Sequence, residues 1–207
     1  MQAKVEKGAV EGREEVERTR EEKKKEILEK IIKAWHEGKT VFFDSGWIGG
    51  AGDWDVITIV EDNEIVYDSH EEKDELYSEV KEEFETYVFD LACKALKRFV
   101  KEKYNYDVKE FYSDDWGWPE VLIEKAELDE KVVRKIEREL KKIDEDAELE
   151  RIEVSAAICS IEERDGLGYS ITKVRYGRPV IHDHVIYSVW VAERAVEEDY
   201  NLFEYLK

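Results

Sequence analysis

Apolar residues recur at two different spacings along the chain, and the alternation of the two predicts an α+β fold. Apolar positions three or four residues apart predict helices over residues 14–37, where this stripe begins only at Ile27, and over 70–103 and 130–142. Short apolar runs bounded by turn residues predict strands over 40–44, 55–62, 63–69, 108–113, 120–126, 151–163, 169–177 and 179–193. A last short helix is predicted over 194–205. The expected order is therefore α-βββ-α-ββ-α-βββ-α.

Short links between successive strands favour antiparallel pairing, so we expect an antiparallel sheet, or sheets, covered by amphipathic helices. The two closing links, "RDGLG" and "YGRP", have turn-like composition. Asp129 is expected to cap the helix over 130–142, with Val133, Ile136, Leu140 and Ile143 facing inward. The long helix over 70–103 should turn these residues toward the core: Leu76, Val80, Phe84, Val88, Leu91, Ala95 and Phe99.

The N-terminal part of the chain contributes little to a core. Before Glu26 the first predicted helix holds one apolar residue, Val16, so residues 1–25 are interpreted as a charged extension, helical or frayed. Residues 26–207 then form one α+β domain. Two packed subdomains, 26–127 and 128–207, fit the order of elements equally well.

Charge is distributed unevenly. The net charge is −20, yet residues 1–30 contain nine acidic and nine basic residues. Residues 44–90 contain sixteen acidic residues against two lysines, and residues 107–130 contain nine against two. Direct binding of nucleic acid needs basic side chains against phosphate, so these windows argue against it. They argue against an anionic membrane surface for the same reason.

Each acidic window contains a tryptophan-bearing loop. The stretch "DSGWIGGAGDWD" holds Asp44, Trp47, Asp53, Trp54 and Asp55, and "DDWGWP" repeats this chemistry with Asp114, Asp115, Trp116 and Trp118. The first joins two predicted strands and lacks the lysine of a phosphate-binding loop. It is either a structural corner built by glycines, a site for a hard cation, or a partner surface. Tryptophan is enriched at binding hot spots, and surrounding carboxylates would attract a basic partner.

The strand "VIHDHVIY" carries a possible metal site. His182 and His184 should point to one face and Asp183 to the other, and two imidazoles at this spacing can share a divalent metal such as zinc. A bare pair of histidines is a weak signature, since two polar residues on a sheet face explain it equally well. No third ligand can be identified, and the leading interpretation involves no cofactor.

Composition bears on the source and the cellular location of the protein. Charged residues make up 42% of the chain, with two prolines and one methionine, a bias that resembles thermophile proteins. Two cysteines do not make a disulfide framework, and no apolar run is long enough to cross a membrane, so a cytoplasmic location is expected.

Together these patterns favour a binding protein over an enzyme. We expect an acidic inhibitor, immunity protein or nucleic-acid mimic that occludes the basic surface of a nuclease or nucleic-acid-binding protein. One alternative is a metal-dependent hydrolase that uses His182 and His184. Another is a structural protein that self-assembles through its N-terminal helix. The sequence determines neither the partner nor the oligomeric state.

Overall fold

The computed structural model describes residues 20–48, 52–62, 64–68, 76–113, 117–166 and 169–207, and for residues 47, 48, 52–54, 67, 68, 165, 166 and 169 the backbone alone. The chain divides into two compact units. Unit 1 comprises residues 1–86 and 160–177, and unit 2 comprises residues 87–159 and 178–207. The three division points fall inside a long helix and two long strands, which a scan of the sequence does not single out.

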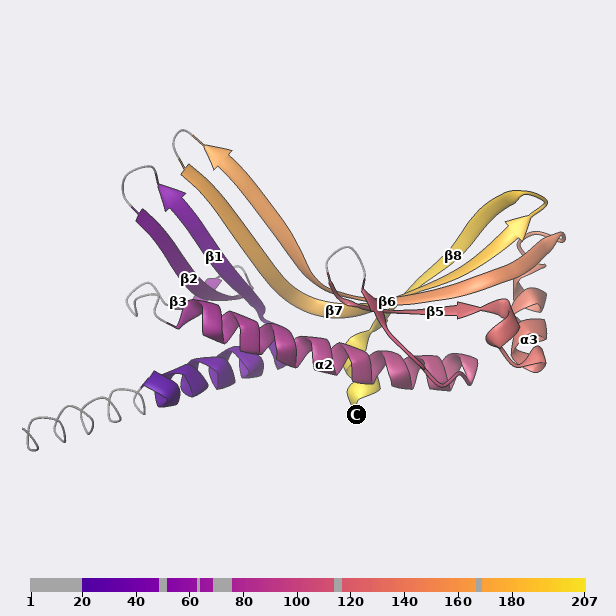
Figure 1. Cartoon of the computed structure of the whole chain (residues 1–207), viewed down its shortest axis with the longest axis horizontal. Coiled ribbons are helices and arrows are strands. Elements are labelled where there is room, and N and C mark those ends of the chain that lie inside the picture. Colours follow the sequence, from indigo (N-terminus) through magenta and orange to yellow (C-terminus); the bar gives the residue numbers. More distant parts are fainter. Residues whose placement is uncertain (1–19, 49–51, 63, 69–75, 114–116, 167–168) are drawn as a thin grey trace, which may run out of the picture. The chain divides into compact units, whose positions relative to one another are not determined.

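The protein is a mixed α+β fold with an eight-stranded antiparallel sheet, which confirms the expected class (Figure 1). The strand order is β3-β2-β1-β7-β6-β5-β4, and β8 also pairs with β7. The strands are β1 (Thr40–Ile48), β2 (Gly52–Glu61), β3 (Glu64–Asp68), β4 (Tyr112–Ser113), β5 (Pro119–Glu124), β6 (Ala147–Gly166), β7 (Tyr169–Val189) and β8 (Ala192–Asn201).

The other regular elements of the described residues are helical. The first helix covers residues 20–36, and it is followed by α2 (Tyr77–Tyr104) and α3 (Glu130–Leu140). Two short 3-10 turns, η1 (Lys125–Glu127) and η2 (Leu202–Leu206), complete the set. Asp129 caps α3 as expected, with its carboxylate accepting a hydrogen bond from the backbone N–H of Lys131 at 2.8 Å. None of the described helices is long and apolar enough to span a bilayer.

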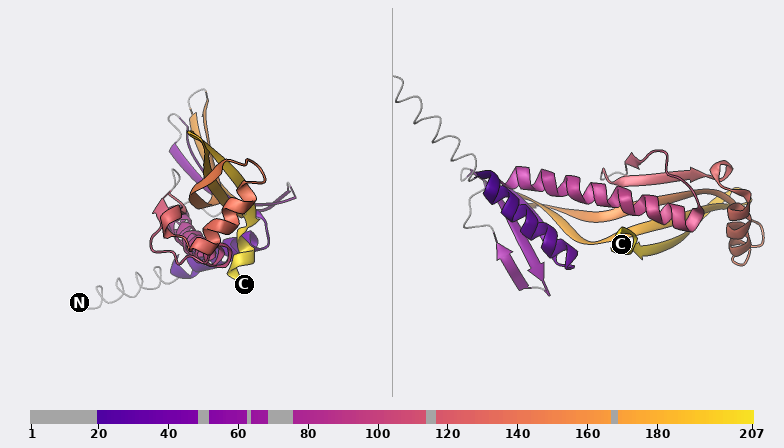
Figure 2. Two further views of the ribbon diagram at one scale, coloured as in Figure 1. Left: turned by 90° about the vertical axis from the view of Figure 1, so that its right-hand side faces the viewer. Right: turned by 90° about the horizontal axis from the view of Figure 1, so that it is seen from below.

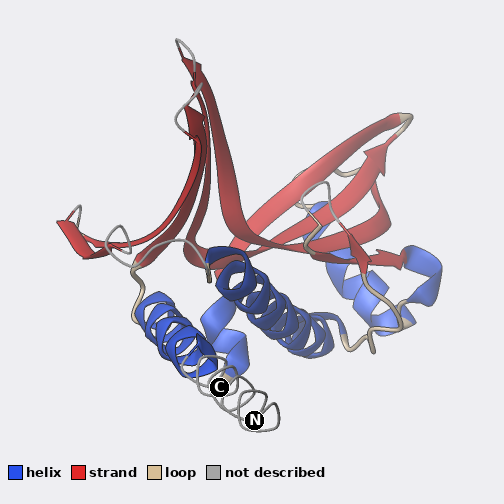
Figure 3. Ribbon diagram, turned by 60° about the vertical axis from the view of Figure 1, so that its left-hand side comes forward, coloured by secondary structure: helices blue, strands red, loops and turns tan. Residues whose placement is uncertain are grey.

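Unit 1 is built around aromatic rings. Trp35 of the first helix, Phe43 of β1, Phe84 of α2 and Tyr176 of β7 are almost fully buried. Phe84 meets Trp35 and Tyr176 edge to face, with ring centroids 5.7 and 5.2 Å apart. The Trp35 indole donates a hydrogen bond to the Gly177 carbonyl at 2.8 Å. Figure 3 shows the first helix lying beside the start of α2.

Unit 2 has a more aliphatic core. Its buried side chains come from the later turns of α2, from alternate positions of β5 and from β6 and β7, and include Val88, Leu96, Val121, Ile123, Leu149, Ile152, Val154 and Ile181. Figure 2 shows η2 beside α2, where Tyr205 packs edge to face on Phe99 with centroids 5.1 Å apart. Of the predicted inward residues of the two helices, Leu91, Val133 and Ile136 are half-buried and Ile143 is 63% exposed.

The structure corrects two predictions in the C-terminal part. The "YGRP" link is not a turn, because β7 runs without interruption from Tyr169 to Val189. The helix expected over 194–205 is wrong as well: β8 occupies Ala192–Asn201, and only Leu202–Leu206 form a 3-10 turn. Val180 to Val189 pair residue by residue with β8, and this tertiary pairing outweighs the helical propensity of Ala and Glu in the segment "AERAVEE".

Candidate functional site

The first tryptophan-bearing stretch is mostly strand, not loop. Asp44 pairs with Val56, Trp47 with Asp53 and Ile48 with Gly52, so the hairpin arms close to residues 49–51, which lie outside the described residues. The apolar pattern missed these arms because glycines and aspartates interrupt it. The side chains of Trp47, Asp53 and Trp54 also lie outside the described part of the chain.

The two aspartates whose side chains are described in this hairpin are partly covered. The Asp44 carboxylate lies 3.5 Å from the Lys173 ammonium and is 16% exposed, and Asp55 is half-buried. Burial and the nearby charges of Asp55 and Asp44 together raise the pKa of Tyr77, which is buried beside them. At least these two carboxylates therefore serve local packing as well as presenting charge.

The second tryptophan-bearing loop is also described only in part. Asp114, Asp115 and Trp116 lie outside the described residues. Trp118 is only 7% exposed: its ring stacks on Phe89 with centroids 6.4 Å apart, and its indole N–H faces the Cys159 sulfur at 3.0 Å. Trp118 therefore belongs to the core of unit 2 and offers little surface to a partner.

An exposed tryptophan occurs instead at a position that sequence reasoning passed over. Trp190 and Val191 form the turn between β7 and β8, and they are 85% and 101% exposed. Trp190 has a positive φ of 61°, a conformation that bulky L-residues rarely adopt. Its indole N–H lies 3.3 Å from a carboxylate oxygen of Asp146. The dipeptide lacks the Asn or Gly of a usual two-residue turn, so no turn signal marked it.

The histidine pair lies as the strand period predicts. The rings of His182 and His184 are half-exposed with centroids 6.2 Å apart, whereas Asp183 between them is 1% exposed. The His182 ring nitrogen Nδ1 lies 2.5 Å from an Asp199 carboxylate oxygen on β8. Within the described ranges, no group of three His, Cys, Asp or Glu side chains is placed to hold a metal.

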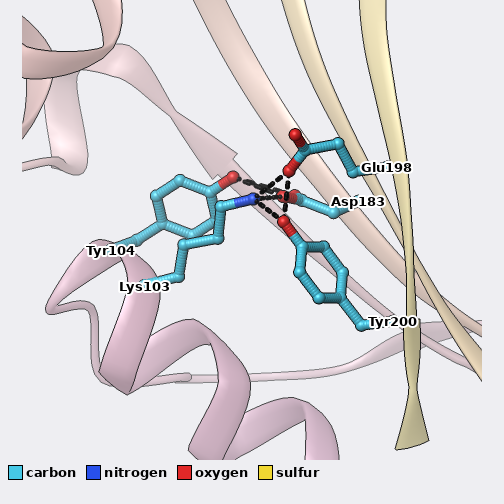
Figure 4. Close-up of polar contacts among 5 residues, drawn as sticks. All are labelled: Lys103, Tyr104, Asp183, Glu198 and Tyr200. Carbon is cyan, nitrogen blue, oxygen red and sulfur yellow. Dashed lines mark hydrogen bonds and ion pairs between the residues drawn. The ribbon is translucent and has the colours of Figure 1, made fainter.

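Buried Asp183 is the centre of a polar cluster in unit 2 (Figure 4). It accepts hydrogen bonds from the Lys103 ammonium at 2.6 Å and from the Tyr104 hydroxyl at 2.7 Å, both at the end of α2. Lys103 also reaches Glu198 at 2.9 Å and the Tyr200 hydroxyl at 2.6 Å on β8. An aspartate at an inward position between Ile181 and Val185 was the sequence signal that could have revealed this cluster.

Lys103, Tyr104 and Glu198 of this cluster have shifted pKa values. Burial lowers the pKa of Lys103, but hydrogen bonds to Asp183, Tyr200 and Glu198 raise it more, so the net shift is upward. Burial and the charge of Asp183 raise the pKa of Tyr104. Hydrogen bonds from Tyr200 and Lys103 lower the pKa of Glu198. All three shifts lead away from neutrality, so these groups are stabilised against proton transfer near pH 7.

The same cluster borders a hollow of ≈ 440 Å³ in unit 2. The hollow lies between α3, the end of α2 and the strands β7 and β8, and it is open to solvent. Lys103, Tyr104, Asp183 and Glu198 line one side of it, and Lys131, Lys135 and Glu139 of α3 line another. Its apolar walls are formed mainly by Val132, Ile136, Leu140, Ile143, Val185 and Val196.

Folding also neutralises part of the acidic window over residues 44–90 with bases from elsewhere in unit 1. Lys24 of the first helix lies 3.0 Å from Glu83 and 3.4 Å from Glu79, and Arg20 reaches Glu79 at 2.6 Å. Residues 20–25, assigned to a charged extension, therefore continue the first helix and contact α2.

Searches for similar proteins found no match to this chain among family models, curated protein sequences or solved structures. The geometry described above is therefore the basis for any functional argument.

Proposed function

We propose that this chain is an acidic binding protein that occludes a basic protein surface. The observation that carries the proposal is the exposed Trp190–Val191 turn. A large apolar side chain at a solvent-exposed turn contributes no burial to the fold, and its left-handed backbone costs about 1–2 kcal/mol. Strain of this kind concentrates at functional positions. A tryptophan ring that fills a partner's pocket would offset the cost.

Acidic side chains lie close to this turn. Exposed Asp146 contacts Trp190, exposed Glu145 precedes it in the segment after α3, and exposed Glu193 follows the turn on β8. Arg151 and Arg194 pair with Glu193 and Asp144, so the carboxylates near the turn are only partly neutralised. Such a field would speed the approach of a basic partner, and the tryptophan would slow its release.

The proposed mechanism is occlusion. Carboxylates take the places that phosphate groups occupy on a basic surface, and the indole ring anchors the centre of the contact. The partner class is therefore a nuclease or another nucleic-acid-binding protein, and the chain acts as its inhibitor, immunity protein or mimic of nucleic acid. The pKa shifts in the polar cluster support a static role for that cluster rather than proton transfer.

The test compares two kinds of variant against a partner purified after capture on the immobilised chain. Trp190→Ala should speed dissociation roughly tenfold or more, the effect of losing a hot spot worth about 2 kcal/mol. Glu145→Gln with Asp146→Asn should slow association and flatten its salt dependence. Surface plasmon resonance at two salt concentrations measures both rates.

Matched controls separate the local contact from general charge. Glu22→Gln with Glu26→Gln removes the same charge from the exposed side of the first helix, and Tyr112→Ala removes another exposed aromatic ring. Both controls should leave the dissociation rate unchanged. If Trp190→Ala dissociates at the rate of the parent protein, the tryptophan is not the anchor and the proposal fails.

A further inference from the structure

We propose that the hollow in unit 2 binds a small amphipathic molecule with an apolar body and one anionic head group. This site is separate from the proposed protein contact and does not depend on it. Its volume of ≈ 440 Å³ lies within the usual range of ligand pockets, roughly 300–1,000 Å³. A mainly apolar lining with a few charged groups is also typical of such pockets.

The apolar part of the hollow indicates that the body of the ligand is apolar. Val132 and Ile136 lie one helical turn apart on α3, and Val185 and Val196 are paired neighbours on β7 and β8. Ile143, just after α3, is 63% exposed although it lines the same hollow. An aliphatic or aromatic body placed there would remove this apolar surface from water, which favours binding.

The charged part of the hollow indicates the sign of the head group's charge. Some charged side chains of the lining have an ion-pair partner and others do not. Lys103 is committed to Asp183 and Glu198, and Glu139 pairs with Lys142. Within the described part of the chain, Lys131 and Lys135 have no carboxylate within ion-pair distance. On the α3 side of the hollow the charge without an ion-pair partner is therefore positive, whereas on the β7 and β8 side Lys103 faces two acids.

The position of the two lysines fixes the direction of the ligand. They lie one turn apart on α3, Lys131 in its first turn, where the helix dipole also favours an anion, and Lys135 at its midpoint. The opposite side carries Asp183 and Glu198, which would repel a second anion. The head group is therefore expected beside Lys131 and Lys135, with the apolar body directed toward Ile136 and Ile143.

Two probes with the same chain and opposite head charges test the assignment. Isothermal titration calorimetry of the full chain should show saturable one-to-one binding of decanoate below its micelle concentration. Decyltrimethylammonium should bind at least several-fold more weakly. Raising the salt concentration should weaken decanoate binding, because exposed charges are screened. Absence of decanoate binding, or equal binding of the two probes, overturns the proposal.

Variants then locate the site. Lys131→Met with Lys135→Met keeps the apolar stems and removes both charges, and it should weaken decanoate binding roughly tenfold. Lys94→Met with Lys141→Met is the matched control, since both residues are exposed in unit 2 and neither lines the hollow. The control pair should bind decanoate like the parent. Equal losses in the two pairs would overturn the head-group assignment.

A filling variant keeps the test independent of charge. Ile136→Trp should occupy the hollow and abolish decanoate binding, while circular dichroism shows that the fold is retained. Unchanged binding by this variant places the ligand elsewhere and overturns the proposal. If the parent binds no decanoate but sedimentation shows a dimer that Ile136→Trp dissociates, the hollow is a contact between two copies and the proposal is likewise overturned.

Discussion

The cores of the two units are built from different kinds of side chain. In unit 1, rings from two helices and two strands fill the interior, and the indole of Trp35 is satisfied by a backbone carbonyl. In unit 2, an aliphatic core borders a buried carboxylate, a lysine that crosses to it and an open hollow. Tight filling serves stability, whereas unfilled apolar space and buried charge cost stability and need another reason. The contrast directs the search for function to unit 2.

The largest expected effect tests how much unit 1 depends on its rings. Trp35→Ala should lower the free energy of unfolding by about 3–5 kcal/mol, because it removes a buried ring and leaves a cavity. Trp190→Ala, at the exposed turn of unit 2, should change it by less than about 0.5 kcal/mol. Urea unfolding followed by circular dichroism measures both. Similar losses in the two variants would contradict the contrast.

The second expected effect compares one lysine from each unit. Lys103→Met leaves the buried Asp183 with Tyr104 as its partner but without a positive charge. It should lower the free energy of unfolding by about 3 kcal/mol. Lys173→Met removes a longer pair with Asp44, at 3.5 Å, and should cost about 1 kcal/mol or less. Equal costs, measured by the same urea unfolding, would show that burial of the acid does not distinguish the two pairs.

The third effect is alkaline loss of stability in unit 2. The folded pKa of Lys103 is raised above its unfolded value, so its contribution is fully present below about pH 10.4 and is lost as the pH rises further. Tyr104 acts in the same direction. Lys103→Arg keeps a charged group at this position over the whole range, and should therefore lessen the fall in melting temperature between pH 10 and pH 12.

The control for this effect is Lys94→Arg, which makes the same change at an exposed position of α2. Its melting temperature should follow that of the parent protein across the same pH range. If Lys103→Arg also follows the parent, titration of Lys103 does not limit alkaline stability.

The smallest effect has the opposite sign. Trp190→Gly should raise the free energy of unfolding by about 1 kcal/mol, because glycine adopts the positive φ of 61° without strain. Val191→Gly, at the neighbouring exposed position, relieves no positive φ and should not stabilise. Thermal unfolding of the two variants side by side measures the difference. A stabilised Trp190→Gly that has also lost its partner would link the strain directly to binding.

Much of the fold could be predicted from local sequence patterns. The cap at Asp129, the hairpin of β4 and β5, and most of the buried face of α2 follow from residue types at fixed spacing, because these features depend on neighbours within one turn or one hairpin. The segment that became β8 shows the limit. Its alanines and glutamates favour a helix, and only its pairing with β7 makes it a strand.

The candidate site was less accessible to sequence reasoning. The sequence by itself determined that acidic residues and tryptophans gather in two windows, and that His182 and His184 share a strand face. Only the tertiary structure decided the exposure of the tryptophans whose side chains it describes: Trp118 packs on Phe89 and is buried, while Trp190 occupies a turn and is exposed. Lys103 and Asp183 are eighty positions apart, and the hollow beside them exists only where α3 meets β7 and β8. Composition and periodicity act locally along the chain, whereas burial and charge pairing depend on which distant segments fold together.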